Sequence, residues 1–285
     1  MTIVDSRPLA ATFLWLDITR ACNLACGHCY NGSGPHGQHG GMEREDWLNV
    51  LDQAAVAGVR QVQLIGGEPT MHPDFADLVE HALGVGLLVE VFSNLTHIKP
   101  DWWELFQREG VSLATSYYSD DAAEHNAVTG RDSHRKTRAN VARAVEMGIA
   151  LRTGVIHVFP EQRVSGAQAD LSSLGVERVG TDRMRHFGRA QGEHDACDVT
   201  ELCGRCGDGV AAIGPNGDVS PCIMSTWMTA GNVRVSPLSA ILNGAEMTHL
   251  ASLIPRTDGG CDPGAECRPD AYPCQPDSKR TIKEA

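Results

Sequence analysis

Strand-like and helix-like stretches alternate along the first two-thirds of this chain. Each short apolar run is followed by a segment whose apolar residues recur every three or four positions, as on one face of a helix. The expected strands cover residues 13–18, 61–65, 87–92, 111–116, 151–158 and 176–179. The expected helices cover residues 43–57, 73–83, 100–108, 135–147 and 164–174. Strict alternation predicts right-handed βαβ units around a parallel sheet. The resulting α/β fold is expected to be a partial, open (β/α)6 barrel, because the units exceed a five-stranded flavodoxin-like sheet and fall short of an eight-unit barrel.

The ten cysteines are distributed very unevenly along the chain. Three lie at Cys22, Cys26 and Cys29, and the other seven lie between Cys197 and Cys274. This asymmetry predicts an N-terminal tail over residues 1–12, a barrel domain over 13–190 and a small cysteine-rich domain over 191–285. The polar stretch at 191–195 is typical of a linker.

Charge and targeting signals limit the classes of protein to which the chain can belong. Among its 285 residues, 36 are acidic and 24 are basic, which gives a net charge of −12. This balance argues against a uniformly basic nucleic-acid-binding surface. No apolar run reaches the roughly 18 residues of a membrane span, and the N-terminus lacks a signal-peptide pattern. We therefore expect a cytoplasmic protein without nucleic-acid or membrane partners, in which clustered cysteines are metal ligands or catalysts rather than disulfides.

The first cysteine group reads Cys22-Asn-Leu-Ala-Cys26-Gly-His-Cys29 and directly follows the first expected strand. Active sites of βα barrels form at this end of the strands. Three thiolates leave a structural zinc site one ligand short, although His28 could supply a strained fourth ligand. They also leave one iron of a 4Fe–4S cluster without a protein ligand, so that a substrate-like molecule can chelate it.

The Cys-x3-Cys-x2-Cys spacing resembles the signature of the radical S-adenosylmethionine (radical SAM) superfamily. The resemblance implies that Cys22, Cys26 and Cys29 bind a 4Fe–4S cluster whose open iron holds the amino and carboxylate groups of S-adenosylmethionine. One electron from the cluster would then cleave the sulfonium and yield a 5′-deoxyadenosyl radical that abstracts hydrogen from a substrate.

Further motifs at the ends of the expected strands match the same family. The segment Gly66-Gly-Glu-Pro69 follows the second strand, where the family meets the methionine amino group, and Ser93-Asn94 ends the third strand, where the family contacts the ribose. The resemblance implies these cofactor-binding residues: Tyr30, Gly66, Gly67, Glu68, Pro69, Ser93, Asn94, Ser116 and Arg131. The alternatives are that Ser116 only caps a helix and that Arg131 is a solvated surface residue. Arg152 could also counter the cofactor carboxylate if it faces the barrel interior.

The second cysteine group predicts an auxiliary metal site. Asn216-Gly217 is a two-residue hairpin signal between residues 210–213 and Val219, and such a hairpin places Cys206 beside Cys222. The pattern resembles the SPASM or shorter twitch extension of radical SAM enzymes. The resemblance implies an auxiliary 4Fe–4S cluster held by Cys203, Cys206, Cys222 and one of three tail cysteines, which are Cys261, Cys267 and Cys274. The tail lacks the paired spacing of a full SPASM unit, so one auxiliary cluster is favoured, while two clusters or a zinc site are the alternatives.

Two features stand outside these motifs. Cys197 is expected to be a packed thiol; if the reaction is a redox-neutral epimerisation, Cys197 becomes a candidate catalytic hydrogen-atom donor, as does a spare Cys261 or Cys267. The segment 30–41 contains five glycines and is expected to be a mobile loop, either a tolerated insertion or a flap over the site.

These features predict an enzyme, and three functions follow from them. The favoured one is a radical SAM maturase that crosslinks, oxidises or epimerises a ribosomally synthesised peptide. The alternative is an epimerase or dehydrogenase acting on an aminoglycoside or another small natural product, and the third is a non-catalytic iron–sulfur or zinc scaffold. The expected partners are the substrate, an electron donor such as flavodoxin or ferredoxin, and a separate peptide-recognition protein, since no N-terminal leader-binding domain is visible.

Overall fold

A computed structural model of the chain describes residues 11–194 and 198–256. The first six strands are β1 (Phe13–Thr19), β2 (Gln61–Gly66), β3 (Leu88–Phe92), β4 (Val111–Tyr117), β5 (Leu151–His157) and β6 (Arg178–Arg183). The α-helices between them are α1 (Arg44–Val56), α2 (Phe75–Gly84), α3 (Pro100–Phe106), α4 (Ala122–Thr129), α5 (His134–Glu146) and α6 (Val164–Ser173). Three short 3₁₀ helices are η1 (Pro69–Met71), η2 (Gly188–Ala190) and η3 (Val199–Glu201). The chain continues through β7 (Val210–Ile213), β8 (Asp218–Ser220), β9 (Gly231–Asn232), α7 (Leu238–Leu242) and α8 (Ala245–Ser252).

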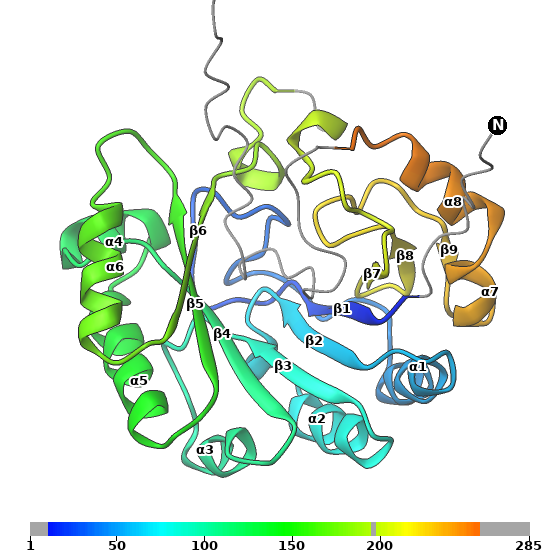
Figure 1. Cartoon of the computed structure of the whole chain (residues 1–285), viewed down its shortest axis with the longest axis horizontal. Coiled ribbons are helices and arrows are strands. Elements are labelled where there is room, and N and C mark those ends of the chain that lie inside the picture. The colour runs from blue at the N-terminus through cyan, green and yellow to red at the C-terminus, as the bar shows by residue number, and fades with distance from the viewer. Residues whose placement is uncertain (1–10, 195–197, 257–285) are drawn as a thin grey trace, which may run out of the picture.

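The strands form one curved sheet that stays open between its two edges (Figure 1). Their order is β6-β5-β4-β3-β2-β1-β7-β8-β9, and all pairs from β6 to β7 are parallel. Strand β1 is central, because residues 13–16 pair with 61–64 on one side and with 210–213 on the other. The partial barrel is confirmed, and the sheet runs across the expected 190–200 linker into the C-terminal part of the chain.

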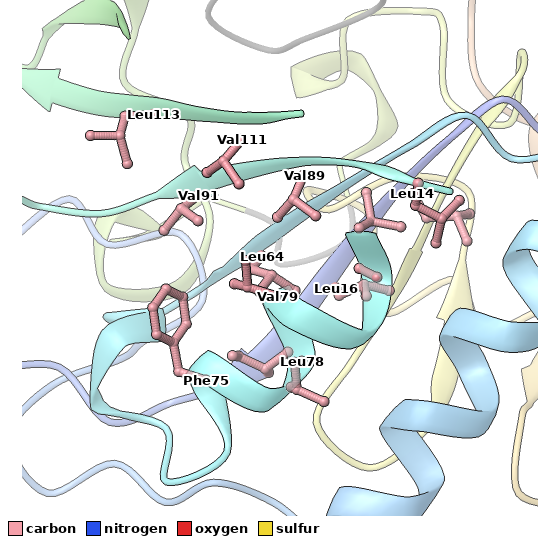
Figure 2. Close-up of a cluster of buried hydrophobic side chains, with 14 of the residues drawn as sticks. Leu14, Leu16, Leu64, Phe75, Leu78, Val79, Val89, Val91, Val111 and Leu113 are labelled. Carbon is pink, nitrogen blue, oxygen red and sulfur yellow. The ribbon is translucent and has the colours of Figure 1, made fainter. Parts of the chain in front are cut away.

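The buried core lies between the sheet and the outer helices. Figure 2 shows α2 packing Phe75, Leu78 and Val79 against side chains of neighbouring strands, including Leu64 and Val91. All of these side chains are buried. Each contributes about 1.5–3 kcal/mol relative to an exposed position, so this face keeps the barrel strands in register. No helix in the described part of the chain is both long and apolar enough to cross a membrane.

The structure corrects four expectations about single elements. Helix α4 was not predicted, and β6 extends to Arg183 rather than ending at residue 179. The hairpin β7–β8 is present, but its loop is Gly214-Pro-Asn-Gly217 rather than two residues. Arg152 faces the interior, yet its guanidinium is taken by the buried carboxylate of Glu90, with Nε–Oε1 and Nη2–Oε2 distances of 2.9 and 2.6 Å.

The glycine-rich segment 30–41 is tied to the body of the protein by backbone hydrogen bonds. The Gly34 N–H donates to the Arg20 carbonyl at 3.1 Å, and the Cys22 N–H donates to the Gly34 carbonyl at 3.0 Å. At its other end, the Gly41 N–H donates to the Pro215 carbonyl at 3.0 Å. The segment therefore bridges the end of β1 and the β7–β8 turn, whereas its composition predicted a mobile loop.

Candidate functional site

A cavity lies at the carboxyl ends of the barrel strands, where the sequence places its motifs. Thiols that follow β1, residues at the end of β2 and polar side chains at the ends of β3, β4 and β6 all line it. Of the residues predicted to bind the cluster or cofactor, these line the cavity: Cys22, Cys26, Cys29, Tyr30, Gly66, Gly67, Asn94 and Ser116. The fold thus brings together residues that are up to 94 positions apart in the sequence.

The three cysteines lie on a loop that is held by the barrel on one side. The Ala25 N–H donates to the Thr129 carbonyl at 3.0 Å, and this contact ties the loop to the end of α4. None of the six described cysteines is in a disulfide. Burial raises the pKa of the Cys22 and Cys26 thiols to about 12, so both are protonated when no metal is bound. Metal ligation requires thiolates and would release these protons.

The surroundings of Cys22 suit a ligating thiolate. The Leu24 N–H points at Cys22 Sγ at 3.4 Å, and Asn94 Nδ2 lies 3.8 Å from the same sulfur. Such donors stabilise negative charge on a cluster thiolate and tune its redox potential. No set of three His, Cys, Asp or Glu side chains within residues 11–194 and 198–256 converges on a single metal ion. A four-iron cluster has a different requirement, because each thiolate binds a different iron.

Gly66 and Gly67 allow the end of β2 to pack against the cysteine loop. A Cβ atom on Gly66 would lie 2.4 Å from the Thr19 carbonyl oxygen, and one on Gly67 would lie 2.3 Å from that of Ala21. Gly66 also has φ of +145°, which side-chain-bearing residues rarely adopt. The glycines therefore keep the β2 backbone at the cavity, with no side chain between it and the thiols.

Glu68 and Ser93 form an internal link rather than part of the cavity wall. The Glu68 carboxylate is 3% exposed and accepts hydrogen bonds from Thr70 N–H and Oγ1, Ser93 Oγ and the Asn94 N–H, at 3.2, 2.6, 2.9 and 2.7 Å. Both carboxylate oxygens thus accept hydrogen bonds within the protein, and the cofactor-binding role expected for Glu68 stays a prediction. Through these hydrogen bonds, Glu68 joins the ends of β2 and β3 and orients Asn94.

Two other predicted residues lie away from the cavity. Pro69 is buried at the start of η1 and is absent from the lining. Arg131 is exposed on the turn after α4, where Nη1 donates to the Gly130 carbonyl at 3.0 Å. This position fits the alternative prediction for Arg131, that it is a solvated surface arginine.

Several residues that line the cavity were not predicted as cofactor-binding residues, and His28 was considered only as a strained zinc ligand. His28 Nε2 lies 3.2 Å from the Tyr118 hydroxyl, and burial lowers the pKa of His28 to about 4, so its ring is neutral. His125 packs edge-on against the Tyr118 ring. Four further polar residues end or follow β6, namely Asp182, Arg183, Arg185 and Arg189. Polar residues at the end of a strand could have identified these four as site residues. The predicted end of β6 lay before them, so they were not recognised as strand-end residues.

The second cysteine group gathers below the β7–β8 hairpin. Cys206 and Cys222 are buried, and their sulfurs lie 2.9 Å apart. Cys206 Sγ donates to Cys222 Sγ, and its hydrogen bonds with Cys203 and Cys222, together with burial, raise the pKa of Cys206. Ile223 and Met224, directly after Cys222, line the main cavity. Cys197, Cys261, Cys267 and Cys274 lie outside the described residues.

Comparison with known families decides what this arrangement is. Residues 16–167, more than half of the chain, match the family model of the radical SAM superfamily. The chain belongs to the radical SAM superfamily. Residues 184–269 match a second model, SPASM, described as an iron–sulfur cluster-binding domain. Both resemblances drawn from the cysteine spacing are thus confirmed. They imply S-adenosylmethionine and a 4Fe–4S cluster as cofactors, with auxiliary iron–sulfur binding in the C-terminal part.

Similar proteins include peptide-modifying enzymes. The chain is 32% identical over 177 residues to a PqqA peptide cyclase of Xanthomonas campestris, which covers 61% of this chain and 47% of the relative. A PqqA peptide cyclase of Streptomyces rochei is 28% identical over 189 residues, covering 65% and 52%. The chain thus spans about half the length of the curated relatives it matches. Among solved structures, Streptococcus suis SuiB bound to its precursor peptide SuiA has a TM-score of 0.72 at 17% identity, covering 86% of this chain and 67% of that one, which shows a shared fold.

Proposed function

We propose that this chain cleaves S-adenosylmethionine reductively and uses the resulting radical to modify a ribosomally synthesised peptide. The observation that carries the proposal is the convergence of Cys22, Cys26 and Cys29 on the cavity that the β2 glycines also line. The similarity to PqqA peptide cyclases supports a peptide rather than a small molecule as substrate.

The chain's own residues would hold the cofactors and shape the site. Cys22, Cys26 and Cys29 would bind the first cluster, and Cys203, Cys206 and Cys222 would bind an auxiliary cluster with a ligand from the tail. When bound, these groups supply an electron that cleaves the sulfonium, a 5′-deoxyadenosyl radical that abstracts a substrate hydrogen, and an acceptor for the electron that an oxidised product must lose.

Polar groups around the thiols would position the cofactor. The backbone of Gly66 and Gly67 would meet the methionine end, because no side chain intervenes there. Asn94 and Ser116 lie at neighbouring strand ends on the same wall and would contact the ribose. Tyr30 lines the cavity directly after the last cysteine and would contact the bound cofactor from the loop side.

The proposed reaction needs an electron donor, and the chain's cysteines need a reducing compartment. An external one-electron donor, such as a flavodoxin or ferredoxin, must reduce the cluster before each cleavage. A peptide-recognition protein would present the substrate. None of the six described cysteines is in a disulfide, which fits a reducing compartment such as the cytoplasm.

The test is anaerobic reconstitution followed by mass spectrometry. The full chain is incubated with S-adenosylmethionine, dithionite and a synthetic peptide encoded by a short reading frame beside its gene. We expect 5′-deoxyadenosine and a peptide of altered mass, both absent when Cys22, Cys26 and Cys29 are changed to alanine. An unchanged peptide together with turnover of an aminoglycoside would replace the peptide assignment with a small-molecule one.

A further inference from the structure

The turn after β6 lies directly on the cysteine loop. Gly188, the first residue of η2, has φ of +56°, and a Cβ atom there would lie 2.4 Å from the carbonyl oxygens of both Cys29 and Tyr30. Because such a distance is far below van der Waals contact, only glycine lets η2 approach the loop this closely. The two segments are about 160 residues apart in the chain, so this packing is a tertiary contact.

Arg189 then bonds to the loop at three points. Its backbone N–H donates to the Cys29 carbonyl at 3.0 Å, its Nε donates to the Cys26 carbonyl at 2.8 Å, and its Nη1 donates to the Gly32 carbonyl at 2.9 Å. The guanidinium presents its donors in a rigid planar fork, so two carbonyls six residues apart are held at a set separation. By comparison, the Gly27 N–H donates to the Val128 carbonyl at 3.4 Å, and His28 Nε2 lies 3.2 Å from the Tyr118 hydroxyl.

We propose that Gly188 and Arg189 form a clasp that holds the cysteine loop in the shape needed to bind the cluster and S-adenosylmethionine. This inference rests on the proposed function and adds a positioning role for Gly188 and for Arg189, which also lines the cavity. The loop needs such support because residues 22–33 form no helix or strand, and an isolated bridge pairs Ala21 with Gly34 only at its two ends. On its other side, the contact of Ala25 with the end of α4 restrains only the first half of the loop.

The clasp also links two parts of the chain. It lies within residues 184–269, which match the SPASM model, so the C-terminal part contacts the loop of the first cluster.

Two glycines with the same backbone conformation provide a matched test. Gly188 and Gly192 both have φ of +56°, but a Cβ atom on Gly192 would meet nothing within 4 Å. Gly188→Ala and Gly192→Ala therefore carry similar backbone strain, and only the first collides with the cysteine loop. In the full chain without metal, hydrogen exchange of residues 24–34 should be at least about fivefold faster in Gly188→Ala, the loss of roughly one hydrogen bond. Gly192→Ala should exchange like the parent.

The second pair of variants separates the hydrogen-bonding fork from the charge. Arg189→Ala and Arg189→Lys both remove the two-point contact, and the lysine keeps the charge. Arg108→Ala, which removes an exposed arginine paired with Glu80, is the control. After reconstitution, we expect both Arg189 variants to bind S-adenosylmethionine at least about tenfold more weakly and to lose the change that it causes in the electron paramagnetic resonance spectrum of the reduced cluster. The control should keep both.

The outcomes separate this inference from the proposed function. If the parent cleaves S-adenosylmethionine while Gly188→Ala and both Arg189 variants match their controls in exchange, binding and spectrum, the clasp is wrong and the function stands. If Arg189→Lys behaves like the parent, charge rather than the clasp is responsible, and the proposal is overturned. If the parent itself forms no 5′-deoxyadenosine, the proposed function fails, and the exchange measurement on the metal-free chain still tests the clasp.

Discussion

The Glu68 carboxylate connects two strand ends whose side chains reach the cavity. Its four hydrogen-bond donors come from η1 and from the end of β3, and each of them would be left without its acceptor if the carboxylate were lost. Burial raises the pKa of this carboxyl, and the hydrogen bonds oppose the rise. The motif therefore contributes a structural link as well as the backbone that lines the site.

Glu68→Gln should destabilise the protein at this link. The amide has the same size, but its nitrogen cannot accept, so a donor such as the Asn94 N–H is left facing an N–H₂ group. We expect a loss of about 1–3 kcal/mol in the free energy of unfolding, measured by urea titration of the metal-free chain. Glu45→Gln, at a side chain that is 80% exposed, is the control and should change stability by less than about 0.5 kcal/mol. Equal midpoints for the two variants would contradict this account.

Arg131→Ala should leave cofactor binding unchanged. The guanidinium is exposed and outside the cavity lining, so its removal costs no contact there. Equilibrium binding of S-adenosylmethionine to the reconstituted variant should match that of the parent within about twofold, since surface substitutions typically change free energies by less than about 0.5 kcal/mol. A loss of tenfold or more would mean that the arginine swings into the site when the cofactor binds.

At the scale of elements, strands and helices are predicted best where buried apolar residues recur at a regular spacing along the sequence. Strands β1 to β5 are mostly buried and carry apolar residues, and their predicted ends lie within about two residues of the observed ones. Helix α4 was missed because its stretch Ala122–Thr129 is polar and lacks an apolar stripe. Strand β6 is an edge strand with half-exposed polar residues, so its second half carried no hydrophobic signal. The cavity arginines that follow β6 were missed for the same reason.

The β7–β8 hairpin should depend on Gly217. This residue has φ of +88°, and a Cβ atom would lie 2.9 Å from Asn232 Oδ1. Gly217→Ala should cost more than the ~1–2 kcal/mol of left-handed strain alone and should reduce the iron bound by the auxiliary site after reconstitution. Gly58→Ala is the control, because its φ of +85° carries similar strain with nothing within 4 Å. If both variants keep the parent's iron content, the hairpin does not set the geometry of Cys206 and Cys222.

At the scale of the whole molecule, β1 joins the two cysteine groups. It carries the first group at its carboxyl end, and it pairs directly with β7, the strand that follows Cys206. Residues 223 and 224 then reach the main cavity from the auxiliary side. The cysteine spacing predicted both groups separately. The sequence did not predict that β1 and β7, the strands next to these two groups, pair in one sheet. Strand order depends on long-range packing, and the local sequence of β1 or β7 does not determine it.

Removal of each cysteine group should therefore separate two functions within one fold. The chain with Cys22, Cys26 and Cys29 changed to alanine should form no 5′-deoxyadenosine and should retain about four irons, the content of one 4Fe–4S cluster. The chain with Cys203, Cys206 and Cys222 changed to alanine should still cleave S-adenosylmethionine, since its first cysteine loop is intact, but should release little oxidised peptide. Iron analysis and mass spectrometry of nucleoside and peptide measure both results. Cleavage by the first variant, or retention of zinc without iron in it, would contradict the assignment of the two groups.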